Sequence, residues 1–228
     1  MPHDVPTPLD RRALLRRLAA GGAIAWATPI VLSTPAAAAE PSCGPGLLDW
    51  DTFTTGSIFS SAVVGNTTVT ITGIAATGTT LFASNRQVTA APAGGVNQKY
   101  LRFEMLPNAV GRSQTITIAF SNPVTNLSFS LYDIDAVTSA WRDELFINTP
   151  GYTWSIPAGS GVQKGTGANI NRFRNSNTNN NAANTSNAGN LNLGHPGPIT
   201  SFVIAYTNGD QSGGQNQWIG LSDLTFTC

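Results

Sequence analysis

Apolar and small polar residues alternate along several stretches of this chain, most clearly over residues 123–135, PVTNLSFSLYDID. Apolar residues hold the odd positions from Leu127 to Leu131, and small polar residues hold the even ones. A period of two is typical of a β-strand with one buried face. Asp133 and Asp135 continue the odd positions, so we expect both carboxylates to leave the strand end on the same side.

The same alternation predicts further strands, and residues 198–206 repeat the pattern of 123–135 in weaker form. No window after Glu40 has helical periodicity, because Pro, Gly, Thr and Asn interrupt each one. In the last apolar segment the parity changes near Ser222 and Asp223, which predicts a β-bulge. The pattern predicts an all-β fold, an antiparallel two-sheet β-sandwich that is jelly-roll-like. The other expected strands cover residues 68–72, 100–105, 115–120, 144–148, 152–156 and 219–226.

Residues 1–39 have the features of a signal peptide. Arg11 and Arg12 are followed by leucines, as in a twin-arginine signal, and the apolar run over residues 18–32 is shorter than the roughly 20 residues of a membrane span. An alanine-rich stretch then predicts cleavage between Ala39 and Glu40, which leaves residues 40–228 as a single domain. An ordinary Sec signal and a retained anchor are the alternatives.

Cleavage changes the charge of the chain. It removes four Arg and two Asp from 12 basic and 12 acidic residues, and the remaining eight and ten give a net charge near −2. This balance indicates neither nucleic acid nor an anionic membrane as a partner. We expect a secreted, extracellular monomer whose surface is rich in hydroxyl and amide groups.

The two cysteines, Cys43 and Cys228, both follow the predicted cleavage site. An even pair in an exported chain favours a disulfide, which here would join the two ends of the domain. Two free thiols are the alternative.

Residues 169–192 contain 11 Asn in 24 positions. Such a tract has too little apolar surface to form core, so it predicts a long polar surface loop. A hydrogen-bonding surface for sugars is the functional interpretation of the same tract.

Several segments together resemble β-sandwich modules that recur in exported and surface proteins of bacteria, mostly without known activity. The resemblance covers residues 113–228 and implies the fold and export, with no particular reaction. Its segments are FSNPVTNLSFSLYDID, Asp143-Glu-Leu-Phe-Ile, Gly165-Thr-Gly, the Asn-rich tract, GPITSFVIAYTNGD and Trp218-Ile-Gly-Leu-Ser-Asp-Leu-Thr-Phe.

The acids around residues 133–143 are candidates for a cation site. Ca²⁺ prefers six to eight oxygen ligands, and a strand end with its next loop can supply them. We therefore expect Asp133, Asp135 and Asp143 to hold Ca²⁺. Alternatively, these are turn residues that bind nearby backbone N–H groups, or Arg142 is their ion-pair partner.

Asp223 at the expected bulge, and Asp49 and Asp51 near the start of the domain, form a second acidic set. Jelly-roll sugar-binding modules resemble this in having a structural cation near their joined terminal strands. A capped bulge and an exposed N-terminal segment are the alternative.

Catalytic patterns are sparse. Glycoside hydrolysis needs two carboxylates, so Glu104 with Glu144 or Asp143 is a candidate pair, although a solvated or salt-bridged Glu104 is the commoner situation. His195 is the only histidine after the signal, no nucleophile motif accompanies it, and we interpret it as a loop residue.

Two tryptophans differ in their expected roles. Trp154 shares a strand face with Tyr152 and Ile156, which predicts a core position. Trp141 follows the paired aspartates in a predicted loop and is the candidate ligand-binding aromatic. The sequence thus favours a non-catalytic exported module that binds a glycan or another surface component, or that is structural; a glycan-processing enzyme with paired carboxylates is the alternative.

Overall fold

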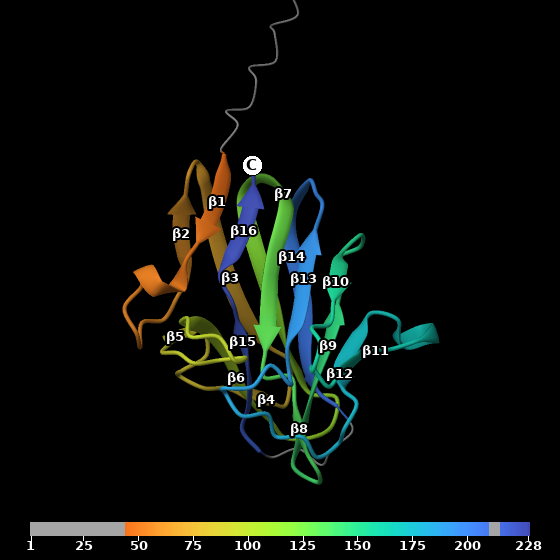
Figure 1. Ribbon diagram of the computed structural model, residues 1–228. Coiled ribbons are helices and arrows are strands. Elements are labelled where there is room, and N and C mark those ends of the chain that lie inside the picture. The colour runs from red at the N-terminus through yellow and green to blue at the C-terminus, as the bar shows by residue number, and fades with distance from the viewer. Residues whose placement is uncertain (1–43, 210–214) are drawn as a thin grey trace, which may run out of the picture. The chain divides into compact units, whose positions relative to one another are not determined.

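Sixteen strands and two short 3₁₀ helices form the part of the chain that this computed structural model describes, residues 44–209 and 215–228 (Figure 1). The strand pairings are antiparallel, so the all-β antiparallel sandwich expected from the alternation is confirmed. The predicted signal peptide, residues 1–39, lies outside the described residues. Within the described ranges, no helix is long and apolar enough to cross a membrane.

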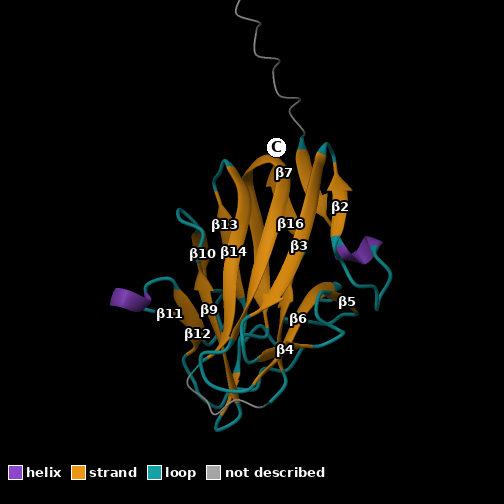
Figure 2. Ribbon diagram, turned by 180° about the vertical axis from the view of Figure 1, so that it is seen from behind, coloured by secondary structure: helices purple, strands orange, loops and turns teal. Residues whose placement is uncertain are grey.

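One layer has the strand order β11–β12–β9–β14–β7–β3–β2, and β14 and β3 of this layer lie in front in Figure 2. Strand β9 also pairs with the two-residue strand β8 (Ala136–Val137). The strands of this layer are β2 (Ser61–Val64), β3 (Thr67–Ala75), β7 (Ser113–Tyr132), β9 (Trp141–Ile147), β11 (Val162–Lys164), β12 (Arg172–Asn175) and β14 (Ile199–Asn208).

The second layer has the order β10–β13–β7–β16–β1, and it lies in front in Figure 1. Strand β15 pairs with both β7 and β6 and so extends this layer. Strand β6 pairs in turn with β4 and β5. The strands of this layer are β1 (Pro45–Leu48), β4 (Thr79–Leu81), β5 (Gln87–Thr89), β6 (Tyr100–Pro107), β10 (Thr153–Ser155), β13 (Leu191–His195), β15 (Gln217–Leu221) and β16 (Leu224–Thr227). The helix η1 (Trp50–Thr52) follows β1, and η2 (Gly167–Asn169) connects β11 to β12.

Strand β7 belongs to both layers. Its even positions are buried from Gln114 to Val124, except the half-buried Asn122, whereas its odd positions are buried from Leu127 onward. The parity changes around Asn126, whose φ of 52° bends the chain from one layer to the other. The two strands expected over 115–120 and 123–135 are therefore one continuous strand.

This strand ends at Tyr132 and does not run on to Asp135 as predicted. The reason is Asp133, whose φ of 64° lies in the left-handed region and cannot continue a β-strand. Asp133 and Asp135 therefore lie on a turn after the strand, and their side chains do not continue its alternation.

The core lies between the layers and is rich in aromatic rings. Phe129 of β7 meets Phe202 of β14 edge to face, with ring centroids 5.2 Å apart. Phe120 and Phe226 form a similar pair at 5.3 Å. Burying each ring contributes about 1.5–3 kcal/mol of stability, and the contacts hold the two layers in register.

The predicted bulge near Ser222 and Asp223 is confirmed by the strand register. Leu221 pairs with Leu131 and Thr225 pairs with Ser128, so four residues on one side span three on β7. Strands β15 and β16 thereby present opposite parities to the same core.

The Asn-rich tract, residues 169–192, is not the continuous surface loop that its composition predicts. Strand β12 and the start of β13 lie within it. Asn175 is fully buried, and its Nδ2 donates to the Ile134 carbonyl at 3.2 Å. Amide side chains that bind backbone groups thus replace apolar packing in this tract.

Candidate functional site

A pocket of about 230 Å³ collects aromatic, acidic and amide side chains from parts of the chain that are far apart in sequence. They come from β6, the connection after β7, the start of β9, the tract before β13, and the start of β15. This is the end of the domain that carries β8, away from the C-terminus (Figure 1). The lining residues are Arg102, Asp133, Asp135, Trp141, Asn181, Asn216, Gln217 and Trp218.

Asp133 presents a carboxylate that accepts no hydrogen bond from any described residue. Burial raises its pKa to about 8; the charge of Asp135 adds to this shift, and the charge of Arg102 opposes it. The basic group that acts on Asp133 is therefore Arg102 of β6, whereas the sequence had suggested Arg142.

Asp135 is 2% exposed, and both of its carboxylate oxygens accept hydrogen bonds. The indole Nε1 of Trp141 donates to Oδ1 at 3.0 Å, and the backbone N–H of Ala182 donates to Oδ2 at 2.9 Å. Burial raises the pKa of Asp135, while these two hydrogen bonds lower it. Asp135 therefore fixes the orientation of the Trp141 ring and ties the Asn-rich tract to the pocket.

Asp143 lies behind the pocket and does not line it. Its Oδ1 accepts the hydroxyl hydrogen of Tyr206 at 2.5 Å, and its Oδ2 accepts the backbone N–H of Asp135 at 3.1 Å. Complete burial raises its pKa well above the ordinary range, the charge of Asp135 adds to this, and the Tyr206 hydrogen bond opposes it. Asp143 thus supports the turn that carries Asp133 and Asp135.

The expected calcium ligands are only partly brought together. Asp133 and Asp135 line one pocket, and Asp143 is turned toward Tyr206. Across residues 44–209 and 215–228, no group of three or more His, Cys, Asp and Glu is arranged to hold a metal ion. The calcium site stays a prediction, and any such site needs amide or carbonyl oxygens in addition to Asp133.

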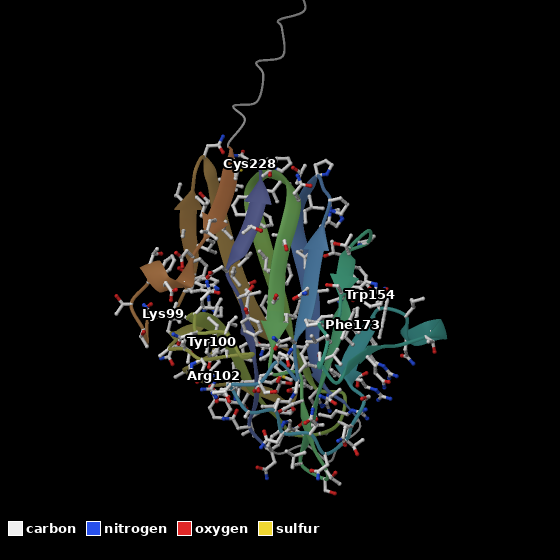
Figure 3. All side chains as sticks on the ribbon, in the orientation of Figure 1. Lys99, Tyr100, Arg102, Trp154, Phe173 and Cys228 are labelled. Carbon is white, nitrogen blue, oxygen red and sulfur yellow. The ribbon has the colours of Figure 1, made fainter. Side chains whose placement is uncertain are left out.

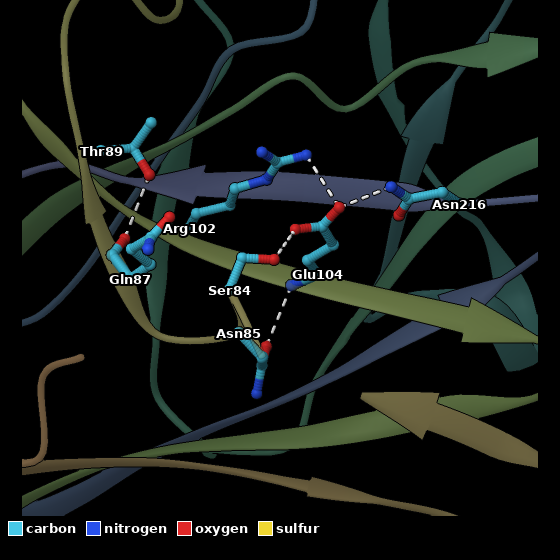
Figure 4. Close-up of polar contacts among 7 residues, drawn as sticks. All are labelled: Ser84, Asn85, Gln87, Thr89, Arg102, Glu104 and Asn216. Carbon is cyan, nitrogen blue, oxygen red and sulfur yellow. Dashed lines mark hydrogen bonds and ion pairs between the residues drawn. The ribbon is translucent and has the colours of Figure 1, made fainter. Parts of the chain in front are cut away.

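Glu104 holds one wall of the pocket in place, as Figure 4 shows. Its carboxylate binds Nη2 of Arg102 at 2.9 Å and accepts hydrogen bonds from Asn216 and Ser84. Its own backbone N–H donates to Asn85 at 2.9 Å. At 4% exposure Glu104 is buried and salt-bridged rather than solvated.

Trp218 forms part of the same wall. The Arg102 guanidinium lies 4.9 Å from the centre of its ring, and the Tyr100 ring stacks on it at 5.6 Å. Gly220 leaves room for this stack, because a Cβ there would lie 2.8 Å from the Tyr100 ring. The wall is therefore a packed set of rings and one guanidinium on β6 and β15.

The sequence analysis identified three lining residues by number, Asp133, Asp135 and Trp141, and did not single out the other five. Of these five, Asn181 lies in the Asn-rich tract that it had considered as a hydrogen-bonding surface for sugars. One of the five carried a signal: Gln217 occupies the core-facing parity of Ile219 and Leu221, where a polar residue is out of place. The side chain is 1% exposed, and within the described residues its Oε1 has no hydrogen-bond partner. The other four residues are Arg102, Asn181, Asn216 and Trp218.

Trp154 is exposed, not in the core as predicted. It is 44% exposed, with Lys164 Nζ 4.8 Å from its ring and Phe173 at 5.7 Å (Figure 3). Among the described strands, β10 pairs only with β13 and is at the edge of its layer, so the ring contacts Phe173 but stays open to solvent on the side that has no neighbouring strand.

His195 ends strand β13 and is buried, so it is not the loop residue that its neighbours suggested. Its Nδ1 accepts the N–H of Gly197 at 2.8 Å, and its Nε2 lies 3.0 Å from the Pro150 carbonyl. Because Nδ1 accepts, Nε2 is the protonated nitrogen and donates to Pro150. His195 thus joins two turns and has a structural role.

The second acidic set forms hydrogen-bonded caps. Asp223 Oδ1 accepts the backbone N–H of Trp50 at 2.8 Å, and Asp49 Oδ1 accepts that of Asp51 at 2.8 Å. Asp51 in turn accepts the backbone N–H of Lys99 at 3.1 Å. These contacts fit the capped-bulge interpretation of this set.

Two other candidates from the sequence remain apart from the pocket. Glu144 forms an ion pair with Arg172 at 3.2 Å on the other layer. Cys228 Sγ lies 3.1 Å from Thr67 Oγ1, and Cys43, its expected partner, lies outside the described residues.

A larger pocket of the described chain, of about 470 Å³, is lined by no titratable side chain. It lies between the Pro150 turn and the start of β14. Size alone therefore does not mark the site, and the smaller pocket beside Trp141 carries the chemistry.

Comparison with known proteins adds no identity: no protein-family model, curated protein or solved structure matches this chain. The resemblance to exported bacterial modules is confirmed only as far as the β-sandwich fold. The function is therefore argued from the side chains of the pocket.

Proposed function

We propose that this protein is an exported, non-catalytic β-sandwich module that binds a glycan in the pocket beside Trp141. The observation that carries the proposal is the composition of this one pocket, which combines tryptophan rings with carboxylates and amides. Sugars have apolar ring faces and a rim of hydroxyl groups. Flat aromatic rings beside hydrogen-bonding side chains suit both features.

The volume of the pocket limits what it holds. Pockets for drug-sized ligands measure roughly 300–1,000 Å³, and this one measures about 230 Å³. A single sugar ring, such as the end of a chain or one branch, is the size that fits.

The placement of the acids supports binding over hydrolysis. Two-carboxylate chemistry needs acids on opposite sides of a scissile bond. Asp133 and Asp135 lie two residues apart on one turn, and both oxygens of Asp135 already accept hydrogen bonds. Glu104 is held by Arg102, and Glu144 by Arg172, in separate ion pairs.

Export is part of the proposal and rests on residues 1–39. N-terminal sequencing of protein recovered from the culture medium should give a sequence that begins at Glu40. Secreted protein that retains residues 1–39 would contradict it. Export that persists when Arg11 and Arg12 are both replaced by Lys would assign the Sec route.

The binding proposal is tested by a glycan array with the mature protein, read with and without calcium. Trp141→Ala should weaken binding of the selected glycan at least about tenfold, because it removes the stacking surface. Trp154→Ala is the matched control, since that exposed ring lies outside the pocket, and it should bind as before. An array with no bound glycan, or equal binding by Trp141→Ala, would refute the proposal. Shortening of a bound oligosaccharide would favour the enzyme.

A further inference from the structure

The pocket beside Trp141 has more acidic than basic side chains. Two carboxylates, Asp133 and Asp135, line it, and Arg102 is the only basic residue among the described lining residues. The guanidinium of Arg102 is already paired with Glu104 at 2.9 Å. Turning Arg102 toward Asp133 would break that ion pair, so the guanidinium stays bound to Glu104 and does not form an ion pair with Asp133.

Two acceptors of the pocket residues have no donor within the described chain. The Asp133 carboxylate accepts no hydrogen bond from a described residue. The Oε1 atom of Gln217, on a side chain that is 1% exposed, likewise has no partner among them. A buried acceptor without a donor costs about 1–3 kcal/mol, so a ligand that supplies donors is favoured.

Asp135 has a different role from Asp133. Trp141 and Ala182 each donate a hydrogen bond to one of its two oxygens, so the main role of Asp135 is to orient the ring. The acceptor left for a ligand is thus Asp133, whereas the Gln217 amide faces the core, where its Nε2 donates to the Thr207 carbonyl at 3.5 Å. A ligand that fits needs positive charge, several N–H donors and a flat face for Trp141.

We propose, building on the glycan-binding function above, that the pocket selects a sugar with a free ammonium group, an unacetylated amino sugar. An ammonium group has three donors, no acceptor and a positive charge, which complements the unpartnered carboxylate of Asp133. An N-acetylated sugar offers one N–H, carries no charge and adds the bulk of the acetyl group. A neutral sugar supplies hydroxyl groups but leaves the carboxylates without a counter-charge.

The experiment compares three β-1,4-linked oligosaccharides of equal length: glucosamine, N-acetylglucosamine and glucose oligomers. Affinities are measured by titration calorimetry with the mature protein in the presence of a chelator, so that no divalent cation competes for the carboxylates. The glucosamine oligomer should bind at least about tenfold more tightly than either of the other two. Equal or tighter binding of an N-acetylglucosamine or glucose oligomer would overturn the amino-sugar inference and leave glycan binding intact.

A simple amine separates the charge from the sugar. Ethanolamine carries the ammonium group without a ring for Trp141, and it should bind at least about tenfold more weakly than the glucosamine oligomer. Binding as tight as that of the oligomer would overturn both this inference and the glycan-binding function. The two failures are thus distinguishable.

Asp133→Asn tests the residue that carries the selectivity. Asn tolerates the left-handed backbone of this position, where φ is 64°, so the variant should fold. It should lose the preference for the glucosamine oligomer, with the affinity ratio falling toward one. Asp51→Asn makes the same change at an exposed site beside Lys99 and should keep the preference. A folded Asp133→Asn variant that retains the full preference would refute the inference.

Discussion

The indole Nε1 of Trp141 donates a hydrogen bond to Oδ1 of Asp135 at 3.0 Å, and both side chains line the same pocket. Trp141 begins strand β9, and Asp135 lies on the turn after β7. Asp135 is 2% exposed, so the hydrogen bond is shielded from water and orients the ring firmly. The carboxylate of Asp135 thereby holds the Trp141 ring in a fixed orientation at the pocket.

This hydrogen bond predicts a coupled stability effect. Trp141→Phe keeps a ring but removes the donor, and we expect a loss of about 1–3 kcal/mol in the free energy of unfolding. A double-mutant cycle with Asp135→Ala, which removes the acceptor, measured by urea denaturation, should give a coupling of about 0.5–3 kcal/mol. Trp154→Phe, at a ring that is 44% exposed, should change stability by less than about 0.5 kcal/mol. Additive effects in the cycle would contradict the support role.

Asp133 predicts a pH dependence of stability. Its ordinary pKa is 3.8 and its folded pKa is about 8, so between these values the folded state holds a proton that the unfolded state has released. Stability should therefore fall as pH rises through this window, by at most about 1.4 kcal/mol per pH unit from this group. The buried acids Asp135 and Asp143, whose pKa values are also raised, act in the same direction.

The measurement is the melting temperature of the mature protein across that pH window. In Asp133→Asn the melting temperature should fall less steeply with pH, because Asn does not titrate and the contribution of this one proton is lost. Asp51→Asn, at an exposed position, should change the slope far less, because burial is the main cause of the raised pKa of Asp223 and Asp51 makes only a minor contribution to it. A wild-type slope of the opposite sign would show that Asp133 is ionised in the folded protein.

The sequence predicted the strands because alternation depends on burial of one face, which is a local property. It placed the five longest strands, β3, β6, β7, β9 and β14, and found the bulge at Ser222. It missed half of the strands, mainly short ones, and it separated the two halves of β7. Nothing in the local pattern distinguishes a strand that ends from one that bends across to a second layer at Asn126. It also carried Asp133 in strand parity, although a turn begins there.

The pocket was predictable only in part for a related reason. The acids and Trp141 were identified because they are close in sequence. Arg102, Asn181 and Trp218 reach the pocket through long-range pairing, such as that of β15 with β6, which no local pattern encodes. Trp154 was misplaced because a strand's alternation does not tell that the strand lies at the edge of its layer.

Asp223 predicts a second stability effect, at the joined ends of the domain. Its Oδ1 accepts the backbone N–H of Trp50 at 2.8 Å, and the Trp50 indole donates to the Ser222 carbonyl at 2.8 Å. Asp223→Ala leaves that N–H without its acceptor and should cost about 1–3 kcal/mol in urea denaturation. Asp223→Asn keeps an acceptor and removes repulsion from Asp49 and Asp51, so its loss should be smaller. An equal loss in both variants would mean that the charge, and not the acceptor, stabilises this junction.

The predicted Cys43–Cys228 bridge has a favourable setting. Pro45 pairs with Thr227, so the described chain begins beside its own C-terminus. A digest analysed without reductant should contain the two terminal peptides linked, and reduction should lower stability by at most about 5 kcal/mol. Recovery of both cysteines as alkylatable thiols from native exported protein would exclude the bridge.

Calcium provides the last test, because the pocket's carboxylates repel one another unless they are protonated, paired or bridged by a cation. If Asp133 holds Ca²⁺ with nearby oxygens, the ion should raise the melting temperature by mass action, by about 2.7 kcal/mol of stability at a hundredfold excess over its Kd. A chelator should reverse the effect. The double variant Asp133→Asn, Asp135→Asn should be insensitive to both additions, while Asp51→Asn should respond like the wild type. A wild-type melting temperature that does not change with calcium or chelator would exclude the calcium site. The repulsion between the acids of the empty pocket would then be relieved by the proton retained on Asp133 and by the positive charge of Arg102.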